Sequence, residues 1–228
     1  MKLLFISLGC DKNLVDSEEM LGMLAADGHQ IVDDEDEAEV IIVNTCCFIG
    51  DAKEESVNTI LEMAEKKKAG TCKVLIVTGC MAQRYKKEIS EEIPEVDAIL
   101  GTTSYGDIIK AVKEAEAGRH FEEYKSIDFL PNISGKRMLT TGGHFAYLKI
   151  AEGCDKHCTY CIIPKLRGSY RSVPMEQLVK EAQSLAEQGV KELILVAQET
   201  TLYGKDLYGK KSLHVLLKEL CKIKGIRW

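Results

Sequence analysis

Lys2-Leu3-Leu4-Phe5-Ile6-Ser7-Leu8 is an almost continuously apolar segment, which predicts a β-strand buried on both faces. Similar short apolar runs follow at residues 40–43, 74–77 and 96–100. Amphipathic stretches that predict helices lie between and after these runs, at residues 17–26, 53–68, 84–92 and 105–117. Strands that alternate with helices favour an α/β fold. We therefore predict a doubly wound parallel sheet with helices on both faces.

The pattern lapses between residues 118 and 143, where Pro131, Asn132, Ser134 and several glycines fall without helical or strand periodicity. After this segment, residues 145–150 and 193–196 predict strands, and residues 174–188 and 213–220 predict helices. We predict three parts: a first domain at 1–120, a linker at 121–143, and at 144–228 the start of a second domain. This second domain has too few βα units for a complete barrel, so we expect a truncated one.

Composition excludes several classes of protein. Of the 228 residues, 45% are apolar and 29% are charged, which is the balance of a globular protein rather than a disordered one. No apolar run approaches the roughly 20 residues of a membrane-spanning helix. The net charge of −6 lacks the basic excess of a protein that binds nucleic acid through bulk charge, so no direct nucleic-acid binding is expected.

The cysteine count points to a reducing compartment. Nine cysteines is an odd number, and a chain of this length does not need disulfides for stability. The apolar run before Gly9-Cys10 holds only about six residues, fewer than the roughly 7–15 of a secretory leader. We therefore expect a cytoplasmic protein whose reduced thiols act as ligands or catalysts.

The strongest chemical signal is a C-x₃-C-x₂-C loop directly after the strand predicted at residues 145–150. Its thiols belong to Cys154, Cys158 and Cys161. Three thiolates this close together can hold three corners of a 4Fe-4S cluster and leave one iron open. The alternative is a zinc knuckle completed by His157 or a distant residue, but His157 adjoins Cys158, where simultaneous ligation is strained.

A second set of thiols is spread along the first domain. Cys10, Cys46 and Cys80 each follow a predicted strand, and Gly9 and Gly79 precede two of them. Ligand sites of open parallel sheets lie beyond the carboxyl ends of the strands, so these thiols are expected to converge on one edge. The alternative is that they are buried core thiols. The other three cysteines share no such position, and we predict structural roles for Cys47, Cys72 and Cys221.

The cysteine loop, with the aromatic Tyr160 before its last cysteine, resembles that of the radical S-adenosylmethionine (SAM) superfamily. Upstream motifs narrow the resemblance to the methylthiotransferases, and within them to the branch that modifies an aspartate of ribosomal protein twelve of the small subunit. The motifs that carry the resemblance lie at residues 7–18, 44–49, 52–56, 78–85, 153–168 and 196–201. They span essentially the whole chain. Two departures stand out: the family usually has a small residue in place of Cys47, and its members carry a longer barrel and a C-terminal TRAM domain.

The resemblance implies two 4Fe-4S clusters and SAM as cofactors. Cys154, Cys158 and Cys161 would hold the cluster that binds and cleaves SAM to a 5′-deoxyadenosyl radical, whereas Cys10, Cys46 and Cys80 would hold an auxiliary cluster that presents the inserted sulfur. Tyr160 and Gln198 are candidates for contact with SAM. The implied substrate is ribosomal protein twelve, and the electron donor would resemble a flavodoxin or ferredoxin.

Five basic residues near the cysteine loop could receive such a donor, although a solvated basic patch is the simpler interpretation. They are Lys149, Lys156, Lys165, Arg167 and Arg171.

Two other functions remain open from sequence alone. The first is methylthiolation of a tRNA adenosine by the same chemistry, although the tRNA-modifying relatives usually lack the Lys-Asn-Leu-Val run found at residues 12–15. The second is a non-catalytic iron–sulfur or zinc module, which would not cleave SAM. The enzyme of the ribosomal branch is our preferred interpretation.

Overall fold

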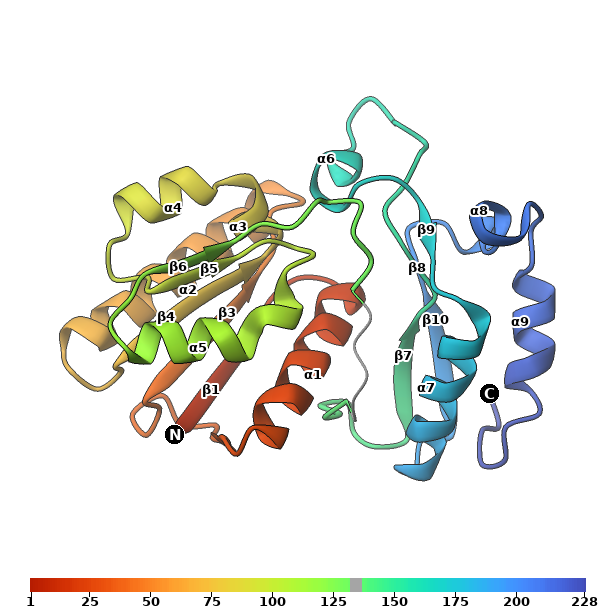
Figure 1. The fold of residues 1–228 in the computed structure, drawn as a ribbon, viewed down its shortest axis with the longest axis horizontal. Helices are drawn as coiled ribbons and strands as arrows, with labels where there is room; N and C mark the ends of the chain where they lie inside the picture. Colours follow the sequence, from red (N-terminus) through yellow and green to blue (C-terminus); the bar gives the residue numbers. More distant parts are fainter. Residues whose placement is uncertain (132–136) are drawn as a thin grey trace. The chain divides into compact units, whose positions relative to one another are not determined.

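A computed structural model describes residues 1–131 and 137–228 of the chain (Figure 1). The chain divides into two compact units, Met1–Arg137 and Met138–Trp228. This division falls inside the segment predicted as a linker, of which residues 132–136 lie outside the described residues. The domain limits drawn from the sequence, 1–120 and 144–228, stay a prediction.

The first unit is built on a parallel sheet. In its described residues, six strands pair in the order β2-β1-β3-β4-β5-β6, and every pair is parallel. The strands are β1 (Lys2–Ser7), β2 (Gln30–Ile31), β3 (Val40–Thr45), β4 (Val74–Gly79), β5 (Ala98–Leu100) and β6 (Phe121–Glu123). All residues of β3 and β4 are buried, as the continuous apolar runs predicted.

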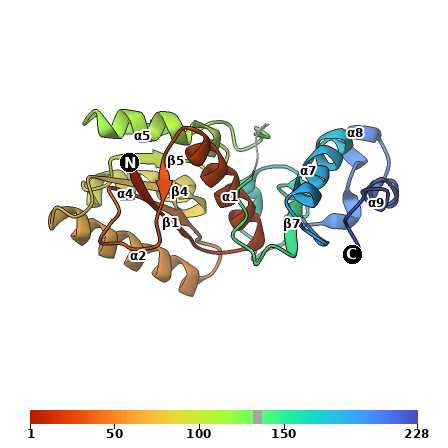
Figure 2. The same ribbon diagram turned by 90° about the horizontal axis from the view of Figure 1, so that it is seen from below.

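Helices cover both faces of this sheet (Figure 2). One face packs against α1 (Asp11–Ala26) and α5 (Ile108–Glu116). Alternate residues of the strands supply its core, so that Ile42 and Ile76 meet Leu24 of α1 and Val112 of α5. The opposite face is covered by α2 (Gly50–Lys68), α3 (Cys80–Arg84) and α4 (Lys86–Glu92). The doubly wound α/β fold is therefore confirmed.

Several element limits differ from the sequence predictions. Helix α1 begins at Asp11 rather than at residue 17, because the face that it buries there is polar and shows no apolar periodicity. Asn13, Asp16, Ser17 and Glu18 are all buried. The stretch predicted as one helix at 84–92 is divided at Tyr85 between α3 and α4. Strand β6 was not predicted, since a three-residue edge strand carries no readable alternation.

The second unit consists of βα units. Strand β7 (Phe145–Lys149) pairs in parallel with β10 (Glu192–Val196), and α7 (Met175–Glu187) connects them. Ala146 and Leu148 pack against Leu178, Ala182 and Leu185 of α7. The other elements are β8 (Ala151–Glu152), β9 (Arg171–Ser172), α6 (Ile163–Arg167), α8 (Lys205–Tyr208), α9 (Leu213–Leu220) and 3₁₀ turns at Thr200–Leu202 and, in the first unit, Tyr105–Asp107.

The chain returns to β10 after α9. The backbone N–H of Trp228 donates to the Lys191 carbonyl at 3.2 Å, and the N–H of Leu193 donates to the Trp228 carbonyl at 2.9 Å. This alternation of bonds is that of a parallel ladder. Trp228 therefore lies beside β10 in the register of a third parallel strand, as in a partial barrel.

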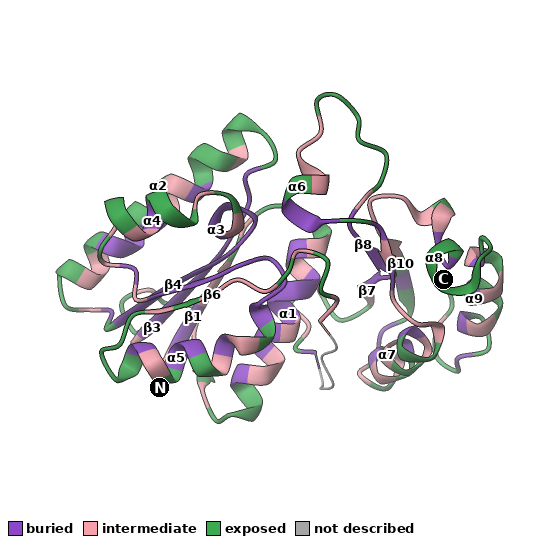
Figure 3. Ribbon diagram, turned by 45° about the horizontal axis from the view of Figure 1, so that its top comes forward, coloured by how far each residue is buried: buried purple, intermediate pink, exposed green. Residues whose placement is uncertain are grey.

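Burial is most complete in the central strands β3, β4 and β5, while the outer faces of the helices are exposed (Figure 3). Among the described residues, no helix combines the length and the apolar character needed to cross a membrane.

Candidate functional site

Three cysteines lie at the carboxyl ends of adjacent strands in the first unit. Cys10 follows β1, Cys46 follows β3, and Cys80 follows β4 as the first residue of α3. Because β1, β3 and β4 are neighbours and run in the same direction, these cysteines share one edge of the sheet. From β1 the chain passes to β2 on one side, and from β2 it crosses to β3 on the other side of β1. The strand order therefore reverses beside β1, and open parallel sheets bind ligands at such a switch point.

Two glycines let the backbone close up around these cysteines. A Cβ on Gly9, whose φ is +97°, would lie 2.7 Å from the Cβ of Cys46 and 3.0 Å from its Sγ. A Cβ on Gly79, whose φ is +92°, would lie 2.3 Å from Oδ1 of Asn44 and 2.6 Å from the Thr45 carbonyl oxygen. Both positions therefore require glycine, for the backbone angle and for the space.

Hydrogen bonds fix the loop after β3. The Ser56 hydroxyl donates to the Cys46 carbonyl at 2.8 Å and accepts from its N–H at 3.0 Å. The Thr45 hydroxyl donates to the Thr78 carbonyl and accepts from the N–H of Met81 at 3.2 Å. Cys46 and Cys80 are each 7% exposed, whereas Cys10 is exposed.

The cysteines outside the two sets differ from one another. The Cys47 thiol donates to the Cys80 carbonyl at 3.3 Å, and burial raises its pKa against the opposing effect of the Arg84 charge. Burial likewise raises the pKa of the Cys72 thiol, which donates to the Val74 carbonyl at 3.0 Å. Cys221 is exposed. The structural roles predicted for these three residues stay a prediction.

The C-x₃-C-x₂-C loop leaves β8 in the second unit through a tight contact. A Cβ on Gly153 would lie only 2.0 Å from the Ser169 carbonyl oxygen, and the N–H of Cys154 donates to the Gly168 carbonyl at 3.0 Å. Cys158 is exposed and Cys154 and Cys161 are half-buried. Tyr160 is 85% exposed, so its ring packs against no part of the described chain to any large extent.

Contacts with other segments of the second unit hold this loop in place. Asp155 accepts from the N–H of Tyr170 at 2.9 Å, and the Tyr170 hydroxyl donates to the Glu199 carbonyl at 3.0 Å. Lys156 forms an ion pair with the carboxylate of Glu199, which follows β10. The hydrogen bonds from Lys156 and Thr201 lower the pKa of Glu199 to about 2. The loop is thereby tied to the carboxyl end of β10.

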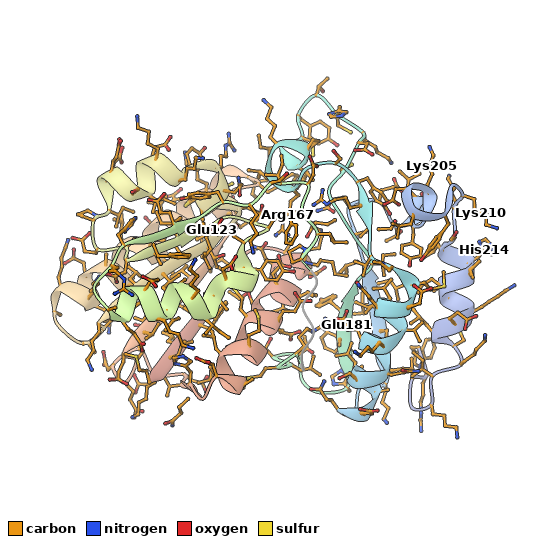
Figure 4. The ribbon with its side chains drawn as sticks, viewed as in Figure 1. Glu123, Arg167, Glu181, Lys205, Lys210 and His214 are labelled. Carbon is orange, nitrogen blue, oxygen red and sulfur yellow. The ribbon has the colours of Figure 1, made fainter. Side chains whose placement is uncertain are left out.

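The basic residues around the loop do not form one solvated patch, so that interpretation was wrong for two of them. Lys149 and Arg167 are 7% and 2% exposed. Arg167, labelled in Figure 4, donates to the buried carboxylate of Glu152 at 2.8 Å, and Lys149 lies 3.4 Å from the same oxygen. Buried charges need partners, and this pairing explains why two cations face inward.

Gln198 lies two residues beyond the end of β10 and carries an unused amide. Its Oε1 and Nε2 atoms are both buried, and neither has a hydrogen-bond partner within the described part of the chain. A buried amide without partners is costly unless a ligand satisfies it. Its position beyond the carboxyl end of a strand is where barrel enzymes bind their ligands.

The donor chemistry of both cysteine sets fits iron–sulfur clusters. None of these six cysteines is part of a disulfide, and the glycines at positions 9, 79 and 153 keep the backbone close around them. As placed, no three His, Cys, Asp or Glu side chains of residues 1–131 and 137–228 are arranged to hold a metal ion. The thiols would therefore have to turn toward a common centre. Their assignment as ligands stays a prediction.

Comparison with known protein families divides the chain into two parts that correspond to the two structural units. Residues 2–101 match the family described as uncharacterized protein family UPF0004, and residues 148–228 match the radical SAM superfamily. A solved structure of the radical SAM methyltransferase TsrM from Kitasatospora setae is 13% identical, with a TM-score of 0.58 over 96% of this chain and 51% of that one. This likeness supports the fold alone.

The more similar relatives are enzymes of one kind. A protein of Lachnoclostridium phytofermentans, named ribosomal protein uS12 methylthiotransferase RimO, is 65% identical over the whole of this chain and 52% of its own length. The protein of the same name from Clostridioides difficile is 54% identical over the whole chain and 51% of its own length. The chain thus spans about half the length of these relatives.

The match to a UPF0004 domain followed by a radical SAM domain defines the class of protein. This chain is similar to radical SAM methylthiotransferases, which its two domain matches and its relatives have in common. Along its entire length it is RimO-like, as its identity to proteins of that name shows.

Proposed function

We propose that the chain is part of an enzyme that inserts sulfur and a methyl group at the β carbon of an aspartate in ribosomal protein uS12. The observation that carries this proposal is the presence of two cysteine trios, one at the carboxyl ends of three parallel strands and one in the loop after β8, together with 65% identity to a protein named for that reaction. Relatives named for uS12 also favour this substrate over a tRNA adenosine.

Two 4Fe-4S clusters and SAM are the cofactors of this proposal. Cys154, Cys158 and Cys161 would hold the first cluster, and three ligands leave one iron open for SAM. Cys10, Cys46 and Cys80 would hold the auxiliary cluster. When bound, the cofactors supply a radical able to remove hydrogen from an unactivated carbon, together with the sulfur and the methyl group.

The protein's own residues would bind and orient these groups. Lys156, Asp155 and Tyr170 fix the first cysteine loop against the end of β10, which limits the positions that a ligand on that loop can take. The unpaired amide of Gln198 is suited to hydrogen-bond the polar groups of SAM or substrate. Tyr160 is exposed enough to lie against the adenine ring.

The same proposal places the protein in the cytoplasm, where thiols stay reduced. Its partners would be uS12 and an electron donor similar to flavodoxin or ferredoxin, and no nucleic acid would be bound directly.

A cellular experiment tests the substrate. Deleting the gene that encodes the chain should remove from the intact mass of uS12 an increment of one sulfur and one methylene. The wild-type gene should restore it, and a Cys154→Ala variant should not. An unchanged uS12 mass in the deletion strain would refute the assignment, and loss of a methylthio group from tRNA instead would support the alternative substrate.

An iron assay tests the cofactors. After anaerobic reconstitution we expect roughly eight irons per chain, falling to about four when Cys154, Cys158 and Cys161 are replaced by alanine. The reduced protein should convert SAM to 5′-deoxyadenosine. About one zinc without sulfide, and no cleavage of SAM, would instead indicate a non-catalytic metal module.

A further inference from the structure

Asn13 lies in the first turn of α1, three residues after Cys10, and its side chain is buried at 1% exposure. Its amide nitrogen donates to two carbonyl groups, that of Leu8 at 2.9 Å and that of Thr45 at 3.0 Å. Its amide oxygen accepts from the Cys80 thiol at 3.9 Å. One side chain therefore contacts three separate segments of the first unit.

Each of these segments carries one cysteine of the proposed auxiliary site. Leu8 is two residues before Cys10, Thr45 directly precedes Cys46, and the third contact is to the thiol of Cys80 itself. These cysteines are far apart in sequence, and the sheet brings only their strands together. The Asn13 amide links the loops that follow the strands.

Asn13 is itself held firmly. Its backbone carbonyl accepts from the amide of Asn44 at 3.0 Å and from the hydroxyl of Ser17 at 2.9 Å. Nδ2 of Asn13 also lies 3.1 Å from the position that a Cβ on Gly9 would take, so the loop before Cys10 passes directly over the amide. A fixed planar group at this point can set the spacing of its neighbours.

The chemistry of the contacts selects an amide. Two donor bonds and one acceptor bond are made at once, and the asparagine amide provides both kinds of group in one plane. Aspartate would lose both donors and place a charge beside the thiols. Leucine would preserve the approximate shape and lose all three hydrogen bonds, so the carbonyl groups of Leu8 and Thr45 would each lose the donor that the amide supplies.

We propose that Asn13 is the positioning residue of the Cys10, Cys46 and Cys80 trio, and that it sets the spacing of the three loops for an iron–sulfur cluster. This inference rests on the proposed function, which assigns a cluster to the trio. Residues that support metal ligands from behind commonly alter metal affinity by about 10–100-fold when replaced. The Asn13 amide fixes the Cys10 and Cys46 segments through Leu8 and Thr45 with or without a cluster, whereas its bond to the Cys80 thiol belongs to the metal-free chain, because a thiolate ligand has no hydrogen to donate. Asn13 is therefore expected to act within that range.

The test uses the chain in which Cys154, Cys158 and Cys161 are alanine, so that iron reports on the trio alone. Asn13→Leu and Asn13→Ala are introduced into this parent and compared with Ser17→Ala. Ser17 is a matched control because it is buried on the same face of α1, one turn further on. Its hydroxyl bonds to Ser7, Asn44 and the backbone carbonyl of Asn13, but it makes no hydrogen bond to Leu8, Thr45 or Cys80, the groups that the Asn13 amide contacts.

Three properties are measured well below the melting temperature of each metal-free variant. They are the iron and sulfide content per chain, the rate of iron loss to a chelator, and the electron paramagnetic resonance spectrum of the reduced cluster. We expect the Asn13 variants to lose iron at least about tenfold faster than the parent, with an altered spectrum. Ser17→Ala should lose iron at the rate of the parent within about twofold, even where its melting temperature falls as far as that of the Asn13 variants.

The outcomes separate the two levels of the proposal. A parent that holds iron, with Asn13 variants that keep it as well as Ser17→Ala and show the same spectrum, would overturn the role of Asn13 and leave the proposed function intact. A parent that holds no iron–sulfur cluster would overturn the assignment of the trio, and with it this inference.

Discussion

Gly79 offers a sharp test of how closely the strand ends approach each other. It is the last residue of β4, directly before Cys80, and its backbone has φ +92° and ψ −156°. Only glycine adopts this conformation readily. Replacing it with alanine adds a single methyl group, which has no room: it would lie 2.6 Å from the carbonyl oxygen and 2.9 Å from the nitrogen of Thr45.

The expected cost has two parts. The backbone strain of a non-glycine residue in this region is about 1–3 kcal/mol. The steric overlap adds about 1–3 kcal/mol, because the Thr45 atoms belong to a ladder strand and cannot rotate away. Gly79→Ala should therefore lower the free energy of unfolding by about 2–6 kcal/mol, a large share of the roughly 5–15 kcal/mol of a typical domain.

Gly70→Ala is the matched control, since Gly70 has a similar φ of +85° with nothing within 4 Å of its added Cβ. It should cost only about 1–2 kcal/mol of backbone strain. Urea unfolding followed by circular dichroism measures both variants, and the fluorescence of Trp228, the sole tryptophan, follows the second unit separately. Free energies of unfolding within about 0.5 kcal/mol of each other would refute the steric argument.

Three other predictions concern the pKa of Glu199, core packing and thiol reactivity. In the metal-free chain, carboxyl NMR should give Glu199 a pKa of about 2, and Lys156→Ala should raise it toward the ordinary value; an unchanged pKa would exclude the ion pair as its cause. Because the folded pKa is the lower one, the ion pair's contribution to stability is present above the unfolded pKa and is lost as the pH falls toward 2. Ile76→Ala, at a fully buried position, should cost about 2–5 kcal/mol in urea unfolding, and a loss below 1 kcal/mol would contradict the packing described for β4. Iodoacetamide at pH 8 should modify the exposed Cys221 at least about tenfold faster than the buried Cys72, whose pKa is raised; equal rates by peptide mass spectrometry would contradict that burial.

Local patterns in the sequence were sufficient for the fold class. A strand buried on both faces must be apolar at successive positions, and 40–43 and 74–77 carry that signal within a few residues. The same signal failed at α1, whose first turns bury Asn13, Asp16 and Glu18. A helix face that is buried by hydrogen bonds and ion pairs has no apolar period to detect.

The cysteine positions could also be predicted, because each follows its strand directly. The arrangement of the residues around these cysteines could not be predicted. The sequence showed five basic residues near Cys154, but only the fold revealed that Lys149 and Arg167 turn inward to Glu152. The position of a charged residue in the sequence does not show whether its side chain faces solvent or the core. Burial of a cation depends on a partner that other elements supply.

The sequence by itself thus determined the alternation of strands and helices, the placement of Cys10, Cys46 and Cys80 after strands, and the C-x₃-C-x₂-C loop, since all of these depend on neighbouring residues. The tertiary structure alone decided that Asn13 reaches Leu8, Thr45 and Cys80 at once, and that Gly79 lies against Thr45. Apart from the local bond to Leu8, those contacts join segments more than 30 residues apart. They exist only because β1, β3 and β4 pair side by side, and strand order is a long-range property that no local pattern encodes.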